Sequence, residues 1–191
     1  MKYYLDIALL PDAEANLGFL WQKVYQQIHI ALVENKIAEN QSAIAVSFPK
    51  YGDKEFPLGN TLRLLTKDKR QLEKLNVEKW LSRLADYTHL KSIKDVPVKV
   101  DEFVCFKRVQ FATNPERLAR RRAKRKSESL ENALAHYAGF KDQHSKLPFV
   151  SMKSSKGNSF RLFVKQEIGH GQEQGAFNCY GLSQTATVPW F

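Results

Sequence analysis

The chain has 191 residues, 43% of them hydrophobic, and a formal net charge of +10. The apolar content suffices for a packed core and argues against a disordered chain, and no apolar run is long enough to span a membrane. The positive charge favours nucleic acid, an anionic membrane surface or an acidic partner. Cys105 and Cys179 form no CxxC pair, which predicts two reduced, buried thiols in a cytoplasmic protein.

The first half of the chain predicts strands and helices in alternation. Its elements are a strand at 3–10, a helix at 16–35, strands at 42–49 and 60–66, helical sequence at 68–86 and a strand at 89–94. The order βαββαβ predicts a ferredoxin-like domain over residues 1–97. RNA-recognition modules share this order, but so do many unrelated proteins.

Pro97 predicts a domain boundary, and residues 98–191 then form a smaller C-terminal domain of an α+β protein. The predicted elements are a strand at 102–111, one helix at 113–137 and a β-hairpin formed by 147–154 and 159–167. Asn114 suits the N-cap position of the helix, and Pro115 suits its first turn.

Residues 117–126 hold seven basic residues and no acid. Leu118 is the only large apolar residue in the first turns of the predicted helix, so no core contact is expected to account for the charge. Five of the basic residues share one helix face: Arg117, Arg120, Arg121, Lys124 and Arg125. Like charges at this spacing repel, which favours a partner rich in phosphate. The alternatives are a solvated face or a targeting patch; a membrane-surface helix would need an opposing apolar stripe.

Arg108 and Gln110 lie on one face of the predicted strand, so both can reach the same ligand. Arginine pairs with guanine, and glutamine with adenine, through two hydrogen bonds each. The major groove of A-form RNA admits a helix only where it opens, near a duplex end or a loop. A short RNA hairpin is therefore the favoured ligand, and two surface polar residues of an edge strand are the alternative.

The histidines show no metal-ligand spacing, and no carboxylate pair suits two-metal chemistry. A ribonuclease can work without metal, because the RNA 2′-OH is itself a nucleophile and one histidine can remove its proton. His29 lies on the first predicted helix, at the flank of the apolar face. By composition alone, a structural role is the expectation for such a histidine.

Several stretches along the whole chain form a specific combination. They are YYLDIALLPD, QIHIALV, VSFP, KRVQFATNPERLARRR, LPFVSMKS, SFRLFVK, CYGLS and the terminal VPWF. Together they resemble the type I-F (Csy, or Ypest-subtype) CRISPR repeat endoribonucleases. The resemblance implies a ferredoxin-like domain, a C-terminal domain with an arginine-rich helix, and cleavage of precursor CRISPR RNA at the base of the repeat stem-loop. Cleavage would be metal-independent and would leave a 2′,3′-cyclic phosphate and a 5′-OH.

The resemblance also implies roles for individual residues. The catalytic histidine falls on His29, the tyrosine that orients it on Tyr180, and the serine that positions the 2′-OH on Ser154. The turn after MKS is one residue shorter than the family pattern, so Ser155 is the alternative serine. Phe160 would stack on the base at the cut site.

Residues that bind the RNA follow from the same comparison. Arg108 and Gln110 would read bases, and the helix would face the groove with Arg120, Arg121, Lys124 and Arg125, beside Arg117. Lys124 departs from the family pattern, because lysine lacks the bidentate geometry with which arginine holds phosphate.

We therefore predict a cytoplasmic, monomeric endoribonuclease without cofactors. It would stay bound to its CRISPR RNA and assemble with other type I-F effector proteins. One alternative is a non-catalytic protein that only caps the RNA hairpin, and such a protein would keep the arginine helix but lose His29. A general RNA- or DNA-binding protein is the other, and it would lack specificity for one hairpin.

Overall fold

A computed structural model describes residues 1–111, 115–138 and 145–191, so Asn114, the predicted N-cap, lies outside the described residues. The chain forms two compact units. Residues 1–109 and 148–191 make the larger unit, and residues 110–147 make the helical unit. These two compact units do not coincide with the predicted domains, residues 1–97 and 98–191. The predicted domain boundary at Pro97 stays a prediction.

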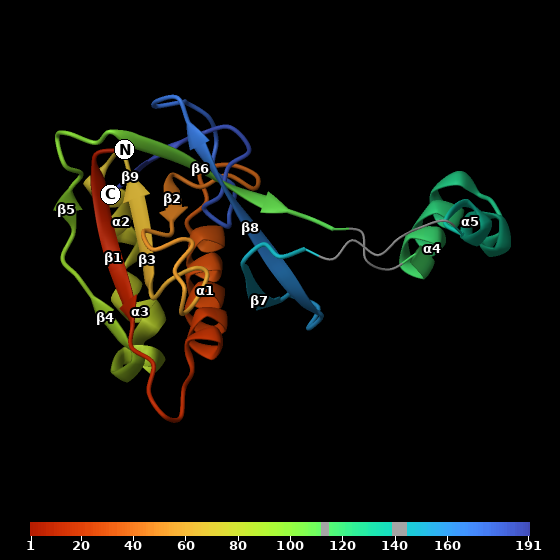
Figure 1. The fold of residues 1–191 in the computed structure, drawn as a ribbon, viewed down its shortest axis with the longest axis horizontal. Coiled ribbons are helices and arrows are strands. Elements are labelled where there is room, and N and C mark those ends of the chain that lie inside the picture. Colours follow the sequence, from red (N-terminus) through yellow and green to blue (C-terminus); the bar gives the residue numbers. More distant parts are fainter. Residues whose placement is uncertain (112–114, 139–144) are drawn as a thin grey trace. The chain divides into compact units, whose positions relative to one another are not determined.

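The larger unit contains the ferredoxin-like arrangement (Figure 1). Its elements are β1 (Tyr3–Leu9), α1 (Leu17–Glu34), β2 (Ile44–Ser47), β3 (Thr61–Thr66), α2 (Lys69–Leu75), α3 (Val77–Leu81), the 3-10 helix η1 (Ser82–Tyr87), β4 (Thr88–Leu90) and β5 (Lys94–Asp95). The strand order is β2-β3-β1-β4, all antiparallel, and β5 also pairs with β1. The α+β, ferredoxin-like fold class is thereby confirmed.

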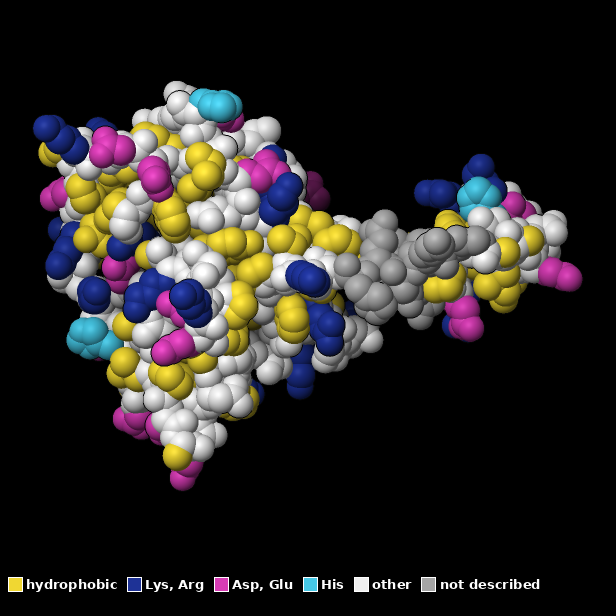
Figure 2. All heavy atoms as spheres, in the orientation of Figure 1, with side chains coloured by type: hydrophobic (Ala, Val, Ile, Leu, Met, Phe, Trp, Pro, Cys, Tyr) yellow, Lys and Arg dark blue, Asp and Glu magenta, His cyan; other side chains and the backbone are white. Residues whose placement is uncertain are grey.

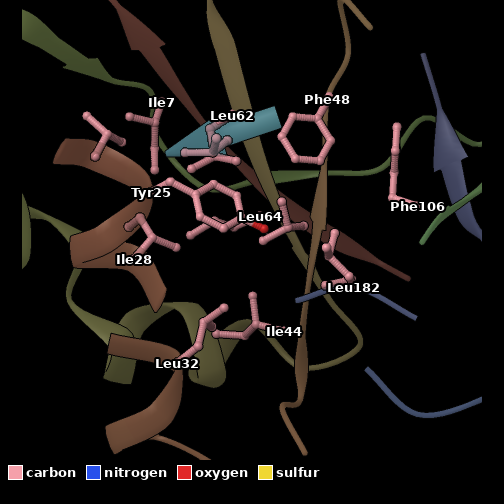
Figure 3. Packing of buried hydrophobic residues seen from close by; sticks show 14 of the residues in the cluster. Ile7, Tyr25, Ile28, Leu32, Ile44, Phe48, Leu62, Leu64, Phe106 and Leu182 are labelled. Carbon is pink, nitrogen blue, oxygen red and sulfur yellow. The ribbon is translucent and has the colours of Figure 1, made fainter. Parts of the chain in front are cut away.

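One face of α1 packs on this sheet and supplies much of the core. Its buried side chains recur every three or four residues: Leu20, Trp21, Val24, Tyr25, Ile28, Ala31 and Leu32. Figure 3 shows Tyr25, Ile28 and Leu32 directed toward side chains of the strands. Asn16 caps the helix, since its side chain accepts a hydrogen bond from the Phe19 N–H. The buried face therefore sets the rotation of the helix about its own axis, and this rotation determines the direction of its other faces.

A second antiparallel sheet completes the larger unit. It consists of β6 (Glu102–Val109), β7 (Phe149–Lys153), β8 (Ser159–Gly169) and β9 (Val188–Trp190), in the order β7-β8-β6-β9. Phe48 and Phe106 join it to the first sheet, with ring centroids 5.0 Å apart. The strand and the hairpin were predicted correctly, but their pairing into one sheet with the chain's last residues was not foreseen.

A buried ion pair fixes the C-terminus to the first sheet. Arg63 Nε lies 2.6 Å from Asp6 Oδ1, and Arg63 Nη2 donates to Asp6 Oδ2 at 3.0 Å. The same guanidinium donates to the Phe191 carbonyl at 2.7 Å and lies 3.9 Å from the Phe191 ring centroid. Both charges are thus paired and hydrogen-bonded, as burial demands.

The helical unit corrects two predictions. The single helix expected over 113–137 is two helices, α4 (Pro115–Lys126) and α5 (Leu130–His136). Helix α4 ends before Ser127, because the backbone of Ser127 is left-handed with φ of 53°. Ser129 then caps α5. The basic helix also has an anchor, since Ala119 is fully buried, as is Ala133 of α5. Small residues let the two helices pack closely, so the scarcity of large apolar residues in α4 does not leave it without a core contact.

Figure 2 shows basic and acidic side chains intermingled over the visible face of the larger unit. The five cations of the predicted α4 face are all exposed. The basic residues behind the net charge of +10 are therefore unevenly distributed along the sequence, and their densest run lies in α4.

Candidate active site

A short loop of residues 177–183 carries Tyr180 and is fixed to the edge of β2. The N–H of Ser42 donates to the Phe177 carbonyl, and the N–H of Val46 donates to the Gly181 carbonyl, both at 2.8 Å. Gly181 has φ of 72°, and a Cβ at this position would lie 2.9 Å from the backbone nitrogen of Val46. Only glycine fits this turn, and its close contact with Val46 fixes the position of the loop on the sheet edge.

The loop orients its own backbone toward α1. Asn178 Oδ1 accepts from the N–H of Tyr180 at 2.8 Å, which closes a tight turn. The Tyr25 hydroxyl then donates to the Tyr180 carbonyl at 2.8 Å, and His29 Nδ1 lies 2.8 Å from the Cys179 carbonyl oxygen. Two consecutive carbonyls thus hold two side chains one helical turn apart.

The bond to Cys179 decides the state of the His29 ring. A carbonyl oxygen only accepts hydrogen bonds, so Nδ1 must carry the hydrogen. In the neutral ring, Nε2 then has a free lone pair and can accept a proton. The local backbone therefore gives His29 the tautomer that a general base needs.

The His29 ring is the first layer of a stack. It lies parallel to the Tyr180 ring, with centroids 4.1 Å apart and an interplanar angle of 1°. The Arg108 guanidinium carbon lies 4.8 Å from the Tyr180 centroid and 5.7 Å from that of Phe160. Four of the predicted site residues, from α1, β6, β8 and the 177–183 loop, are therefore brought together within the larger unit.

The surroundings lower the pKa of His29. Burial of the half-exposed ring is the largest cause, and the positive charge of Arg108 adds to it. The hydrogen bond with the Cys179 carbonyl acts in the opposite direction but is outweighed. The surroundings therefore favour the neutral form of His29.

Ser154 follows β7 at the start of the hairpin turn. Its Oγ accepts from the N–H of Asn158 at 3.1 Å and donates to no group in the described part of the chain. The N–H of Lys153 donates to Gln26 Oε1 at 2.9 Å, which joins this strand end to α1 one turn before His29. Ser155 is exposed, whereas Ser154 is half-buried.

Gln110 and the cations of α4 belong to the helical unit. Gln110 is exposed, as are Arg117, Arg120, Arg121, Lys124 and Arg125. Arg122 is different, because its Nε lies 2.6 Å from Glu128 Oε1 and both side chains are largely covered. This pair ties α4 to the segment that precedes α5.

Sequence analysis missed the residues that hold the site. Tyr25 and Gln26 looked like ordinary helix residues, and only their partners reveal their function. Asn178 and Gly181 carried a detectable signal, since Asn at the first position and Gly at the fourth is typical of a β-turn.

Both cysteines are free and buried, as predicted. Within residues 1–111, 115–138 and 145–191, no three His, Cys, Asp or Glu side chains are placed to hold a metal ion. Across the same residues, no helix has the length and apolar character that a membrane crossing requires.

Comparison with known proteins decides the family. The model of CRISPR-associated proteins named Cas_Csy4 matches residues 4–191. The chain belongs to the Cas_Csy4 family. It is 35% identical over 193 residues to the CRISPR-associated endonuclease Cas6/Csy4 of Escherichia coli (strain UTI89 / UPEC), and 36% identical over 197 residues to that of Pseudomonas aeruginosa (strain UCBPP-PA14). Each alignment covers 100% of both chains, so the resemblance predicted from the sequence is confirmed.

Proposed function

We propose that this Cas_Csy4 protein is an endoribonuclease that processes precursor CRISPR RNA at the base of the repeat stem-loop. The full-length similarity to proteins named CRISPR-associated endonucleases supports the activity. The observation that carries the mechanism is the His29–Cys179 hydrogen bond, which leaves Nε2 as a proton acceptor.

The reaction uses the RNA's own nucleophile. His29 Nε2 takes the proton of the 2′-OH next to the cut, and the 2′ oxygen bonds to the adjacent phosphorus. The P–O5′ bond breaks, and the 5′ oxygen leaves and takes up a proton from water, to which the protonated His29 ring returns its own proton. The products are a 2′,3′-cyclic phosphate and a 5′-OH, and no metal or other cofactor is needed for the balance.

The remaining site residues position the groups that react. Tyr180 holds the imidazole plane by stacking, and Ser154 offers its hydroxyl hydrogen toward the 2′ oxygen or the phosphate. The Phe160 ring stacks on the base at the cut site. The Arg108 guanidinium, which lies over the Phe160 ring in the free protein, first moves away from it and binds a base edge. A near-attack geometry of this kind is worth several orders of magnitude in rate.

The exposed cations of α4 bind phosphates of the stem, and Arg108 with Gln110 reads bases at its foot. We further propose that the protein is a cytoplasmic monomer that stays on its product and joins the other type I-F effector proteins.

The test is incubation of the protein with a repeat hairpin in EDTA, followed by analysis of the product ends. Cleavage should survive chelation and give a cyclic phosphate, and a 2′-deoxy nucleotide before the cut should stop the reaction but not binding. Loss of cleavage in EDTA, or a 3′-OH product, would reject the mechanism. Binding without any cleavage would favour the non-catalytic hairpin-capping protein, and equal affinity for unrelated hairpins would favour a general nucleic-acid-binding protein.

A further inference from the structure

A groove of about 520 Å³ lies in the larger unit between α1 and the segment formed by α3 and η1. From α1 it is lined by Phe19, Lys23 and Gln27, which recur every four residues along one face. Gln27 and His29 are two residues apart, which is about 200° around the helix. The groove is therefore on a different face of α1 from the candidate active site (Figure 1 shows α1 and α3).

The lining of the groove combines aromatic rings with positive charge. Phe19 is 46% exposed although it is a large apolar residue, and the Lys23 ammonium lies 5.1 Å from its ring centroid. Trp80 of α3 also lines the groove and is half-buried. Lys23, Lys79 and Arg83 also line the groove, and no carboxylate does. None of these three cations forms an ion pair with any side chain in the described ranges.

This combination matches a particular ligand. Accessible aromatic rings next to cations that form no ion pair suit single-stranded nucleic acid, because bases stack on rings while cations follow the phosphates. An acidic peptide would use the cations but has no need of an exposed phenylalanine ring beside a half-buried tryptophan ring. The amide of Gln27 adds a donor and an acceptor at the edge of the groove, where a base could meet it.

We propose that this groove binds the single-stranded RNA that flanks the repeat hairpin in the precursor. Bases stack on Phe19 and Trp80, and phosphates contact Lys23, Lys79 and Arg83. The proposal rests on the proposed function for the source of the RNA. It gives the enzyme a second contact that distinguishes a precursor or a mature CRISPR RNA from an isolated hairpin.

The experiment measures the dissociation constant of a repeat hairpin made uncleavable by a 2′-deoxy nucleotide, with no tail, with a 5′ uridine tail and with a 3′ uridine tail. In the unmodified protein, one tail should tighten binding at least about fivefold, which is the lower range for one stacked base. Lys79→Glu/Arg83→Glu should abolish this gain. The matched control is Lys54→Glu/Lys74→Glu, which makes the same charge change at exposed lysines outside the groove and should keep it.

Phe19→Ala tests stacking separately and should reduce the gain severalfold. The proposal is overturned if neither tail adds affinity, if the control pair loses the gain equally, or if Phe19→Ala keeps it in full. The last outcome would indicate a site for any anion, including an acidic peptide.

Two further measurements separate this proposal from the proposed function. All groove variants should cleave a hairpin that keeps one nucleotide beyond the cut but carries no longer tail at the unmodified rate, since none touches the candidate active site. Binding of a short oligouridylate alone is measured in parallel, so that the groove is tested even if the protein binds no repeat hairpin. Equal oligouridylate affinity of the Lys79→Glu/Arg83→Glu pair and its control would reject the groove as an RNA site.

Discussion

The His29–Tyr180–Arg108 stack and the basic helix α4 are opposites in construction. The stack is held by rings, two backbone carbonyls and a loop seated on a sheet edge. The five cations of the predicted α4 face are exposed, and the 3.7 Å pair of Arg120 with Glu116 is itself exposed to solvent. Precise geometry is what proton transfer requires, whereas phosphate binding requires charge that can adjust. Chemistry should therefore depend on the stack, and salt-sensitive affinity on the helix.

The largest effect is expected from His29→Ala. It should slow cleavage by about 10²–10⁴-fold, as for a lost general base, with little change in hairpin affinity. Single-turnover cleavage and equilibrium binding measure the two quantities. His89→Ala is the matched control, because His89 is an exposed histidine of β4 in the same unit. If the His29→Ala variant cleaves at the unmodified rate, the stack takes no part in the chemistry.

Ser154→Ala should also slow cleavage, while Ser155→Ala should not. The half-buried position of Ser154, next to the Lys153–Gln26 hydrogen bond, supports this choice. Single-turnover rates of the two variants on the same hairpin decide it. The reverse result would place the shorter turn in another register.

Gly181→Ala should disturb the stack through the loop that carries it. Alanine with φ of 72° costs roughly 1–3 kcal/mol of strain. The collision with Val46 adds roughly 1–3 kcal/mol of overpacking. Gly157→Ala is the control, since its φ of 77° gives similar strain but its Cβ would meet open space. Urea unfolding of both variants measures the difference, and equal losses of stability would show that the loop is not seated as described.

The helix and the base readers should fail in different ways. Arg120→Ala should weaken binding to matched and mismatched hairpins alike and lower the slope of log K against log salt by roughly one unit. Gln110→Ala should cost about 1–3 kcal/mol at one base pair and leave the slope nearly unchanged. Salt titrations on the cognate hairpin and on one with its lowest pair swapped measure both. Lost discrimination in Arg120→Ala, with none lost in Gln110→Ala, would refute this division.

The smallest effect concerns pH. The pKa of His29 is below its ordinary value, so the neutral, active form persists to a lower pH than in an ordinary histidine, and the cleavage rate should fall as pH drops through that lowered pKa. Arg108→Ala removes a positive charge, so the pKa of His29 should rise and the fall in rate should begin at higher pH. NMR titration of the free protein measures the shift, with Arg161→Ala as control, because Arg161 lies over Phe149 instead. If Arg108→Ala leaves the pKa of His29 unchanged, the guanidinium does not influence the protonation of the base.

The sequence by itself determined most of the elements, the ferredoxin-like order and the exposed basic face of α4. These depend on periodicity and local charge, which neighbouring residues encode. It also supplied motifs that resemble one family, and through them His29, Tyr180 and Ser154 as candidates.

Tertiary structure alone decided how those candidates meet. Tyr25, Gln26 and Cys179 hold the site through hydrogen bonds between segments as much as 155 residues apart, and no local pattern encodes such partners. The break at Ser127 escaped prediction because serine rarely adopts positive φ, and the second sheet escaped it because β6 pairs with a C-terminal strand some 86 residues later. The tautomer of His29 depends on one carbonyl of a distant loop, so only the folded chain decides it.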